Sequence, residues 1–161
     1  LDPKTDLDEL QVNVVALTHL TKLFLPGMIA RGDGRILNVA SIAAFEPGPL
    51  MAVYYASKAY VLSFSEALAN EVEGTGVSVT TLCPGITRTG FQARGAMEDS
   101  RLVQGEMADA ASVALAGYRA VMTRKGVVVP GLGNKVVSVA VRLAPRSVVT
   151  RMVRRAQERV R

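Results

Sequence analysis

Apolar residues recur at helical spacing along the first thirty positions of the chain. Asp6 begins this stretch, as expected for an acidic residue at a helix start, and Leu10, Val14 and Leu17 follow on one face. Further apolar residues widen that face, which indicates a helix buried on two sides. We therefore predict one long helix over residues 6–30, ended by the Gly-containing turn that follows it.

The rest of the pattern alternates short apolar runs with longer periodic segments. The runs predict strands at 35–40, 77–82 and 126–129, and the periodic segments predict helices at 54–73, 108–124, 134–144 and 147–160. Strands separated by helices imply a parallel sheet with crossover connections. The expected class is α/β, a doubly wound, three-layered Rossmann-like fold. Three strands would leave an exposed edge, so we expect this chain to be the second half of a larger sheet.

Composition narrows the class of protein. The 161 residues are 49 % apolar, enough for one buried core, and they include one Cys and one His. A single thiol excludes an internal disulfide, and Cys83, before Pro84, is interpreted as a small core residue rather than a reactive thiol. No apolar run reaches the roughly 18 residues of a membrane span and no signal peptide is evident. We expect a reducing, cytoplasmic setting without a metal site.

Positive charge is concentrated at the C-terminal end of the sequence. The net charge is +5, whereas the residues from Arg142 onward contain seven Arg against the single acid Glu158. The basic character therefore belongs to the tail and does not indicate nucleic-acid binding. We predict a tail helix with an apolar seam packed on the body and a solvated basic face; a membrane-surface helix or an anionic partner is the alternative.

Three residues with compatible chemistry follow the first predicted strand. Ser41 comes directly after it, and Tyr54 and Lys58 lie four positions apart near the start of the next helix, on one face. Ligands of open α/β sheets bind at the carboxyl ends of strands. An ammonium beside a phenol lowers the phenol pKa from about 10, which suits proton transfer to a carbonyl oxygen. Tyr55, three residues before Lys58, is the alternative phenol.

The sequence around these residues resembles the C-terminal part of the classical short-chain dehydrogenase/reductase family. The strings GRILNVAS, YYASK and VTTLCPGITRT are similar to its serine strand, its Tyr-x-x-x-Lys helix and its Pro-Gly turn. The helix containing QVNVVALTHLTKLFLPGM places Asn13 at the family's catalytic asparagine. Two positions depart from the usual pattern: Ala40 replaces a serine, and Thr87 stands where an aliphatic residue is common.

The resemblance implies a role for each of these residues. Tyr54 would be the general acid/base, Lys58 would lower its pKa and bind the nicotinamide ribose, and Ser41 would polarise the substrate carbonyl. Asn13 would hold a water in a proton relay with Lys58. The implied cofactor contacts are Tyr54, Lys58, Pro84, Gly85, Thr87 and Thr89. NAD or NADP is the implied cofactor, a small apolar carbonyl or alcohol the substrate, and a homodimer or homotetramer built on helices 8–30 and 54–73 the assembly.

The resemblance also divides the chain. Residues 1–161 would be the C-terminal part of a single domain, with a catalytic core at 5–130, a substrate lid at 86–106 and a basic helical tail at 132–161. The family's Gly-rich phosphate loop and the residue that selects NAD or NADP belong to its N-terminal part, so we expect the chain alone to bind cofactor poorly. The alternative function is a non-catalytic Rossmann-like module for binding or assembly.

Overall fold

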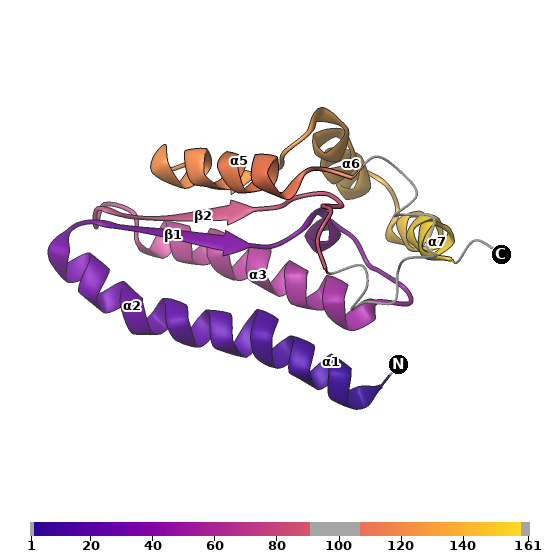
Figure 1. Cartoon of the computed structure of the whole chain (residues 1–161), viewed down its shortest axis with the longest axis horizontal. Coiled ribbons are helices and arrows are strands. Elements are labelled where there is room, and N and C mark those ends of the chain that lie inside the picture. Colours follow the sequence, from indigo (N-terminus) through magenta and orange to yellow (C-terminus); the bar gives the residue numbers. More distant parts are fainter. Residues whose placement is uncertain (1, 91–106, 159–161) are drawn as a thin grey trace.

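Three parallel strands form one sheet in the computed structural model, which describes residues 2–90 and 107–158 (Figure 1). The strands are β1 (Gly34–Val39), β2 (Val77–Leu82) and β3 (Val127–Val128), in the order β1-β2-β3. The pairing of β1 with β2 runs from Gly34 opposite Val77 to Val39 opposite Leu82. The predicted parallel α/β sheet is confirmed, with a third strand shorter than expected.

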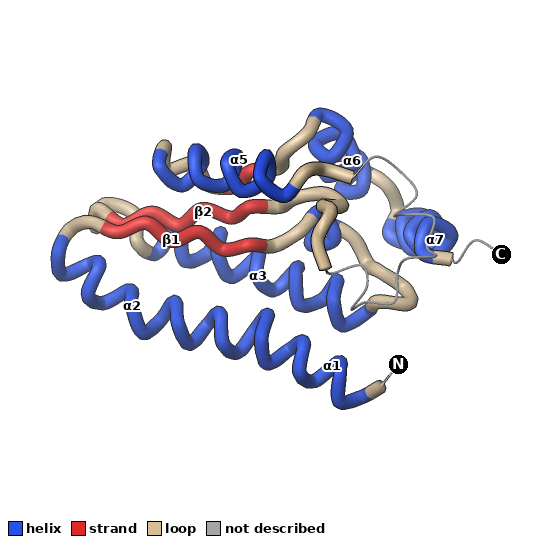
Figure 2. The backbone as a smooth tube through the Cα atoms, in the orientation of Figure 1, coloured by secondary structure: helices blue, strands red, loops and turns tan. Residues whose placement is uncertain are grey.

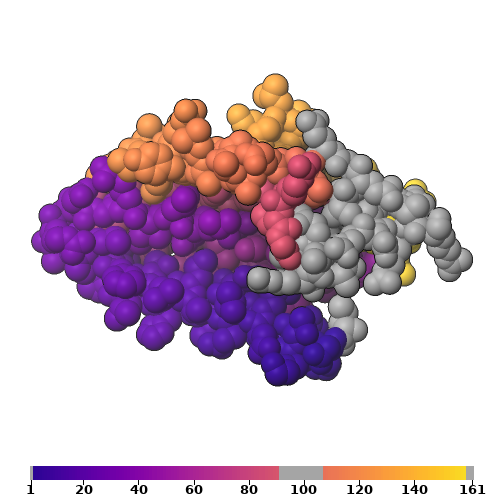
Figure 3. Space-filling view, viewed as in Figure 1, coloured from indigo at the N-terminus to yellow at the C-terminus, as the bar shows by residue number. Residues whose placement is uncertain are grey.

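Helices cover both faces of this sheet. In chain order they are α1 (Pro3–Leu10), the π-helical turn η1 (Gln11–Ala16), α2 (Leu17–Arg31), the 3-10 turn η2 (Ile42–Phe45), α3 (Ala52–Glu71), α5 (Ala110–Met122), α6 (Leu132–Leu143) and α7 (Arg146–Gln157). Figure 2 shows α2 and α3 on one side of the strands and α5 on the other. In the space-filling view, α5 and the N-terminal helix form opposite surfaces (Figure 3). The predicted three-layered arrangement is therefore confirmed.

Two apolar clusters hold α3 against the sheet. One consists of Leu25, Leu68, Val72, Val77 and Val79, and the other of Ala40, Val61, Leu62 and Cys83. The second cluster joins the end of β1 to the middle of α3 and to the residue that follows β2. It therefore fixes the first half of α3 over the carboxyl ends of the strands, where ligands bind in sheets of this kind.

The N-terminal helix runs without a break from Pro3 to Arg31, through α1, η1 and α2. By length and composition alone it could cross a membrane, although no single apolar run in the sequence is that long. Its Leu25 packs with Leu68 of α3 and Val79 of β2, which is the position of a helix that covers a sheet. The helix ends at Gly32, whose φ of 68° is the left-handed conformation typical of a helix C-terminus.

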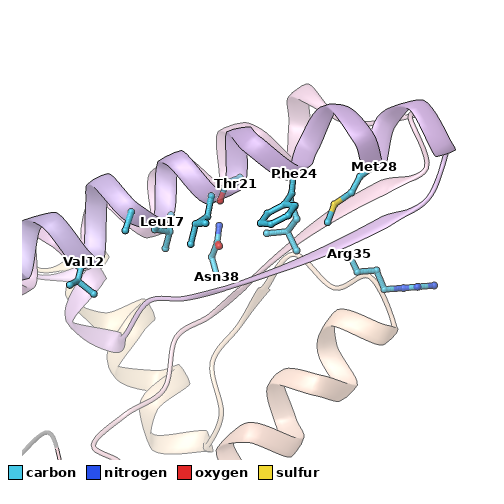
Figure 4. Close-up of a pocket in the computed structure, with 10 residues that line it drawn as sticks. Val12, Leu17, Thr21, Phe24, Met28, Arg35 and Asn38 are labelled. Carbon is cyan, nitrogen blue, oxygen red and sulfur yellow. The ribbon is translucent and has the colours of Figure 1, made fainter.

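An apolar groove of about 490 Å³ lies between α2 and β1 (Figure 4). Its lining residues are Val12, Ala16, Leu17, Leu20, Thr21, Phe24, Met28, Arg35, Ile36 and Asn38. Within the described residues, β1 pairs with β2 on one side, and its other side faces this groove. An unpaired strand edge beside apolar side chains is a surface to which a further strand can add. The groove contains none of the predicted catalytic residues.

Some boundaries differ from those predicted. The helix predicted from 54 begins at Ala52, and the loop before it contains the η2 turn. Of the predicted lid, residues 91–106 lie outside the described residues, and Thr87 near its start forms a parallel bridge with Ala108. The last helix ends at Gln157 rather than at residue 160.

Candidate active site

Ser41 lies where the carboxyl ends of β1 and β2 meet. Its Oγ accepts a hydrogen bond from the backbone N of Ala43 at 3.2 Å and so caps the η2 turn. The same hydroxyl donates to the carbonyl oxygen of Pro84, 3.5 Å away, in the turn that follows β2. The side chain is buried. Contacts to both strand ends therefore fix the position of this hydroxyl.

Tyr54 and Lys58 approach Ser41 from the first turns of α3. The side chain of Tyr54 lies close enough to Ser41 for that hydroxyl to lower its pKa. Lys58 Nζ donates to the carbonyl oxygen of Val39 at 3.1 Å and lies 5.8 Å from the centroid of the Tyr54 ring. The structure thus gathers the three residues at one edge of the sheet, as the four-residue spacing on α3 predicts.

The direction of the Tyr54 pKa differs from the one predicted. Burial raises the pKa of Tyr54, the hydrogen bond from Ser41 opposes that rise, and the negative charge of Glu9 adds to it. Burial also lowers the pKa of Lys58, against the effect of Glu9. The expected lowering of the Tyr54 pKa by Lys58 is therefore not found in this structure. Burial disfavours the charged phenolate, and this effect is larger than the stabilisation that Ser41 gives to it.

Tyr55, the alternative phenol, belongs to the core. Its hydroxyl accepts a hydrogen bond from Nε2 of Gln157 at 2.9 Å, and both side chains are buried. Its ring packs with Val149 and Val153 of α7, while Tyr54 reaches Ser41. The geometry therefore favours Tyr54 as the phenol of the site. It also confirms the predicted packing of the last helix through an apolar seam.

Asn13 is in the π-helical turn η1 and is linked to Tyr54 through Ser57. Its Nδ2 donates to Oγ of Ser57 at 3.0 Å, and that Oγ donates to the carbonyl oxygen of Tyr54 at 2.8 Å. π-Helical turns inside α-helices are frequent at functional sites. The Asn13 side chain therefore supports the backbone beside Tyr54; the predicted water relay to Lys58 stays a prediction.

Two further residues of the site, Ser57 and Glu9, were not among those predicted. Ser57 is almost fully buried and comes three residues after Tyr54, a spacing at which serine bonds back to the helix backbone. Glu9 Oε1 accepts from Asn13 Nδ2 at 3.4 Å, one helical turn away. Burial raises the pKa of Glu9, while the charge of Lys58 lowers it. The sequence shows that Ser57 is three residues from Tyr54 and that Glu9 is four residues from Asn13. It does not show that Asn13 contacts both Ser57 and Glu9.

The Pro84–Gly85 turn borders Ser41 on the side of β2. The carbonyl oxygen of Pro84 accepts from the backbone N of Ile42 at 2.9 Å as well as from Ser41. A Cβ on Gly85 would collide with the end of the Asn134 side chain, so a larger residue here would have to displace that side chain. Of the other predicted cofactor contacts, Thr87 Oγ1 donates to the Gly85 carbonyl at 3.0 Å and Thr89 is exposed. The turn is therefore next to Ser41, and Thr87 and Thr89 follow the turn along the chain.

Cys83, between β2 and Pro84, is expected to resist alkylation in the folded protein. Its side chain has no exposed surface, and burial raises the pKa of its thiol to about 12. At about pH 8 only about one such thiol in 10⁴ would be the reactive thiolate. Iodoacetamide followed by mass spectrometry should label Cys83 in denaturant and leave it unmodified without denaturant. Equal labelling rates in the two conditions would contradict the burial.

A model of the short chain dehydrogenase family matches residues 2–99, more than half of the chain. The chain belongs to the short-chain dehydrogenase family. The matched region contains all the residues gathered at the site, Asn13, Ser41, Tyr54 and Lys58, and the Pro84–Gly85 turn.

Curated relatives are similar to this chain over part of their length. A protein named ketoacyl reductase HetN from Nostoc sp. is 42 % identical over 80 residues, which cover 49 % of this chain and 28 % of the relative. The very-long-chain 3-oxoacyl-CoA reductase of Mus musculus is 38 % identical over 80 residues, covering 50 % of this chain and 26 % of the relative. The matched part thus spans about a quarter of these relatives' length.

Solved structures share the fold over most of this chain. A short-chain dehydrogenase from Sphingobium yanoikuyae in complex with NADPH has a TM-score of 0.75 and 27 % identity, covering 82 % of this chain and 51 % of its own. A short-chain dehydrogenase from Burkholderia cenocepacia has a TM-score of 0.77, covering 94 % of this chain and 60 % of its own at 24 % identity. The fold described here corresponds to about half of each.

Proposed function

We propose that the protein is an NAD(P)-dependent oxidoreductase that interconverts a carbonyl and an alcohol by hydride transfer. The observation that carries this proposal is the gathering of Ser41, Tyr54 and Lys58 at the carboxyl end of the sheet, where Lys58 Nζ lies 5.8 Å from the centroid of the Tyr54 ring. Membership of the family and the NADPH of the Sphingobium relative support it. The proposed catalytic residues are Tyr54, Lys58, Ser41 and Asn13.

The residues at this edge fit the nicotinamide end of such a cofactor. Lys58 uses one of its three ammonium donors on Val39, and an ammonium can also donate to ribose hydroxyls. Gly85 carries no side chain at the turn beside Ser41. We propose that Lys58 binds the ribose and that the Pro84–Gly85 turn, with Thr87 and Thr89, lies along the nicotinamide. A bound reduced nicotinamide would supply the hydride to the carbonyl carbon.

The hydroxyl groups of Ser41 and Tyr54 would bind the substrate oxygen and, in the case of Tyr54, supply the proton. We propose that Ser41 and Tyr54 both bind the substrate oxygen, with the Ser41 hydroxyl turning from the Pro84 carbonyl to donate to it. A raised pKa keeps Tyr54 protonated at neutral pH, which is the state required to donate a proton to a developing alkoxide. Ser57 and Asn13 would hold the backbone of Tyr54 in place while the proton moves.

The substrate class and the assembly are also proposals. The relatives named ketoacyl and 3-oxoacyl-CoA reductases suggest a ketone within an acyl chain, in line with the apolar substrate expected from the sequence. Exposed apolar side chains on α2 and α3, among them Leu23 and Tyr60, support pairing of these helices with a second copy in a dimer or tetramer. A cytoplasmic location is proposed from the single, buried thiol.

The test is turnover by the protein at its full natural length. Oxidation of NADPH and of NADH would be followed with a panel of ketones and 3-oxoacyl thioesters. Ser41→Ala removes one of the two donors to the substrate oxygen and is expected to lower kcat by about 10²-fold. Ser112→Ala, on α5 away from the site, is the matched control. If no carbonyl compound is reduced with either cofactor, the non-catalytic binding module is the better account.

A further inference from the structure

The helix α6 packs on the body through Asn134, Ser138 and Val141, of which Val141 lies against the cluster around Tyr55 and Val149. Ser138 is 7 % exposed, and Asn134 donates from Nδ2 to the carbonyl oxygen of Pro130 at 2.7 Å and lies against Gly85. A helix on the surface of a soluble domain normally buries its apolar side and exposes its polar side. In α6 the packed side contains two polar residues beside Val141, and most of the apolar residues lie on the exposed side.

The opposite side of α6 is an exposed apolar stripe. It consists of Leu132, Val136, Val139 and Leu143, which are 80 %, 68 %, 57 % and 83 % exposed. Their spacing of four, three and four residues places them in one line along the helix. Leu132 and Leu143 are more exposed than any other large apolar residue in the described part of the chain. A continuous apolar surface of this kind marks an interaction site.

Basic residues are frequent in α6 and in the segment that follows it. Residues 132–158 contain six Lys and Arg against the single acid Glu158. Lys135 is exposed on α6, whereas the guanidinium of Arg142 lies 4.8 Å from the centroid of the Phe45 ring. The helix α7 exposes three more guanidinium groups on the side away from its buried seam. Those on α7 are Arg151, Arg154 and Arg155. None of these basic residues forms an ion pair within residues 2–90 and 107–158.

We propose that the apolar stripe of α6, with the basic residues around it, binds the surface of an anionic lipid bilayer. A convex apolar line flanked by cations is typical of helices that lie in the membrane interface, with apolar side chains at the headgroup boundary and basic ones on lipid phosphates. Each Lys or Arg near an anionic leaflet adds to the attraction. The surface thus has both components that such binding requires.

Charge and topology argue against two other occupants. A second copy of the chain placed on this stripe would bring two sets of uncompensated cations together, and like charges repel. Further strands of a larger sheet would add at the open edge of β1, whereas α6 follows β3, which lies at the other edge. A bilayer with anionic lipids is the occupant that matches both the apolar and the basic residues.

The experiment is sedimentation of the full-length protein with two kinds of vesicle, phosphatidylcholine alone and phosphatidylcholine with phosphatidylglycerol. We expect at least tenfold stronger partitioning onto the anionic vesicles, weakened by added salt. The double variant Leu132→Ser, Leu143→Ser should lower that partitioning at least tenfold with an unchanged circular dichroism spectrum. A second variant, Arg151→Gln, Arg154→Gln, Arg155→Gln, should remove most of the preference for the anionic vesicles.

The control is Leu115→Ser, Met122→Ser, which removes two exposed apolar residues from α5 and should leave partitioning unchanged. Binding that survives both test variants would overturn the proposal, as would the absence of binding to anionic vesicles. A dimer that the Leu132, Leu143 variant dissolves, without vesicle binding, would show instead that a second copy covers α6.

Discussion

The Tyr54→Phe variant of the full-length protein is expected to reduce carbonyl substrates about 10³-fold more slowly than the unchanged protein. The substitution removes one oxygen atom and keeps the ring that packs over the start of α3. It deletes the proposed proton donor, so the loss should fall on kcat. Steady-state kinetics with saturating NADPH or NADH would measure it.

Tyr55→Phe is the control for this prediction because it makes the same chemical change one residue away. It removes the hydroxyl that accepts from Gln157 in the core, which should lower the free energy of unfolding by about 1 kcal/mol. Its kcat should stay within about threefold, since general acid catalysis does not pass through this hydroxyl. The assignment of the two tyrosines would be reversed if Tyr55→Phe lost turnover and Tyr54→Phe kept it.

The parts of the site that the sequence predicts are those that depend on local spacing. Ser41 directly follows an apolar run, and Tyr54 and Lys58 are four residues apart on a helix, so a parallel sheet brings them to one edge. The bond from Asn13 to Ser57 joins residues 44 positions apart. It requires the N-terminal helix to lie along α3, which residue spacing alone does not specify.

The pKa of Tyr54 is likewise not predictable from residue spacing alone. A lysine one turn away suggests a lowered pKa, because the Coulomb effect of a neighbour is visible in the spacing. Burial acts in the other direction, and its size depends on how much of the fold surrounds the ring. The polarity of α6 is a similar case: its sequence contains an apolar line, but only the packing of Ser138 and Asn134 shows that this line faces outward.

Gly76→Ala is expected to destabilise the protein by about 3 kcal/mol. Gly76 precedes β2 with a φ of 81°, and a Cβ there would collide with the backbone carbonyl of Gly32. That carbonyl cannot withdraw freely, because Gly32 ends α2 and is followed closely by the β1–β2 pairing of Gly34 with Val77. The two turns therefore touch at a point where both backbones are fixed.

Gly74→Ala separates the two causes of this loss. Gly74 has nearly the same φ, 79°, but a Cβ there would meet nothing within 4 Å. The free energy of unfolding of this variant should therefore fall by only about 1 kcal/mol, the cost of a left-handed conformation for alanine. Urea unfolding of the two variants gives the difference directly, and that difference is the contact with Gly32. Equal decreases in the free energy of unfolding would mean that the turns at Gly32 and Gly76 move apart to accommodate the new Cβ. The backbone before β2 would then be less rigid than its contact with Gly32 implies.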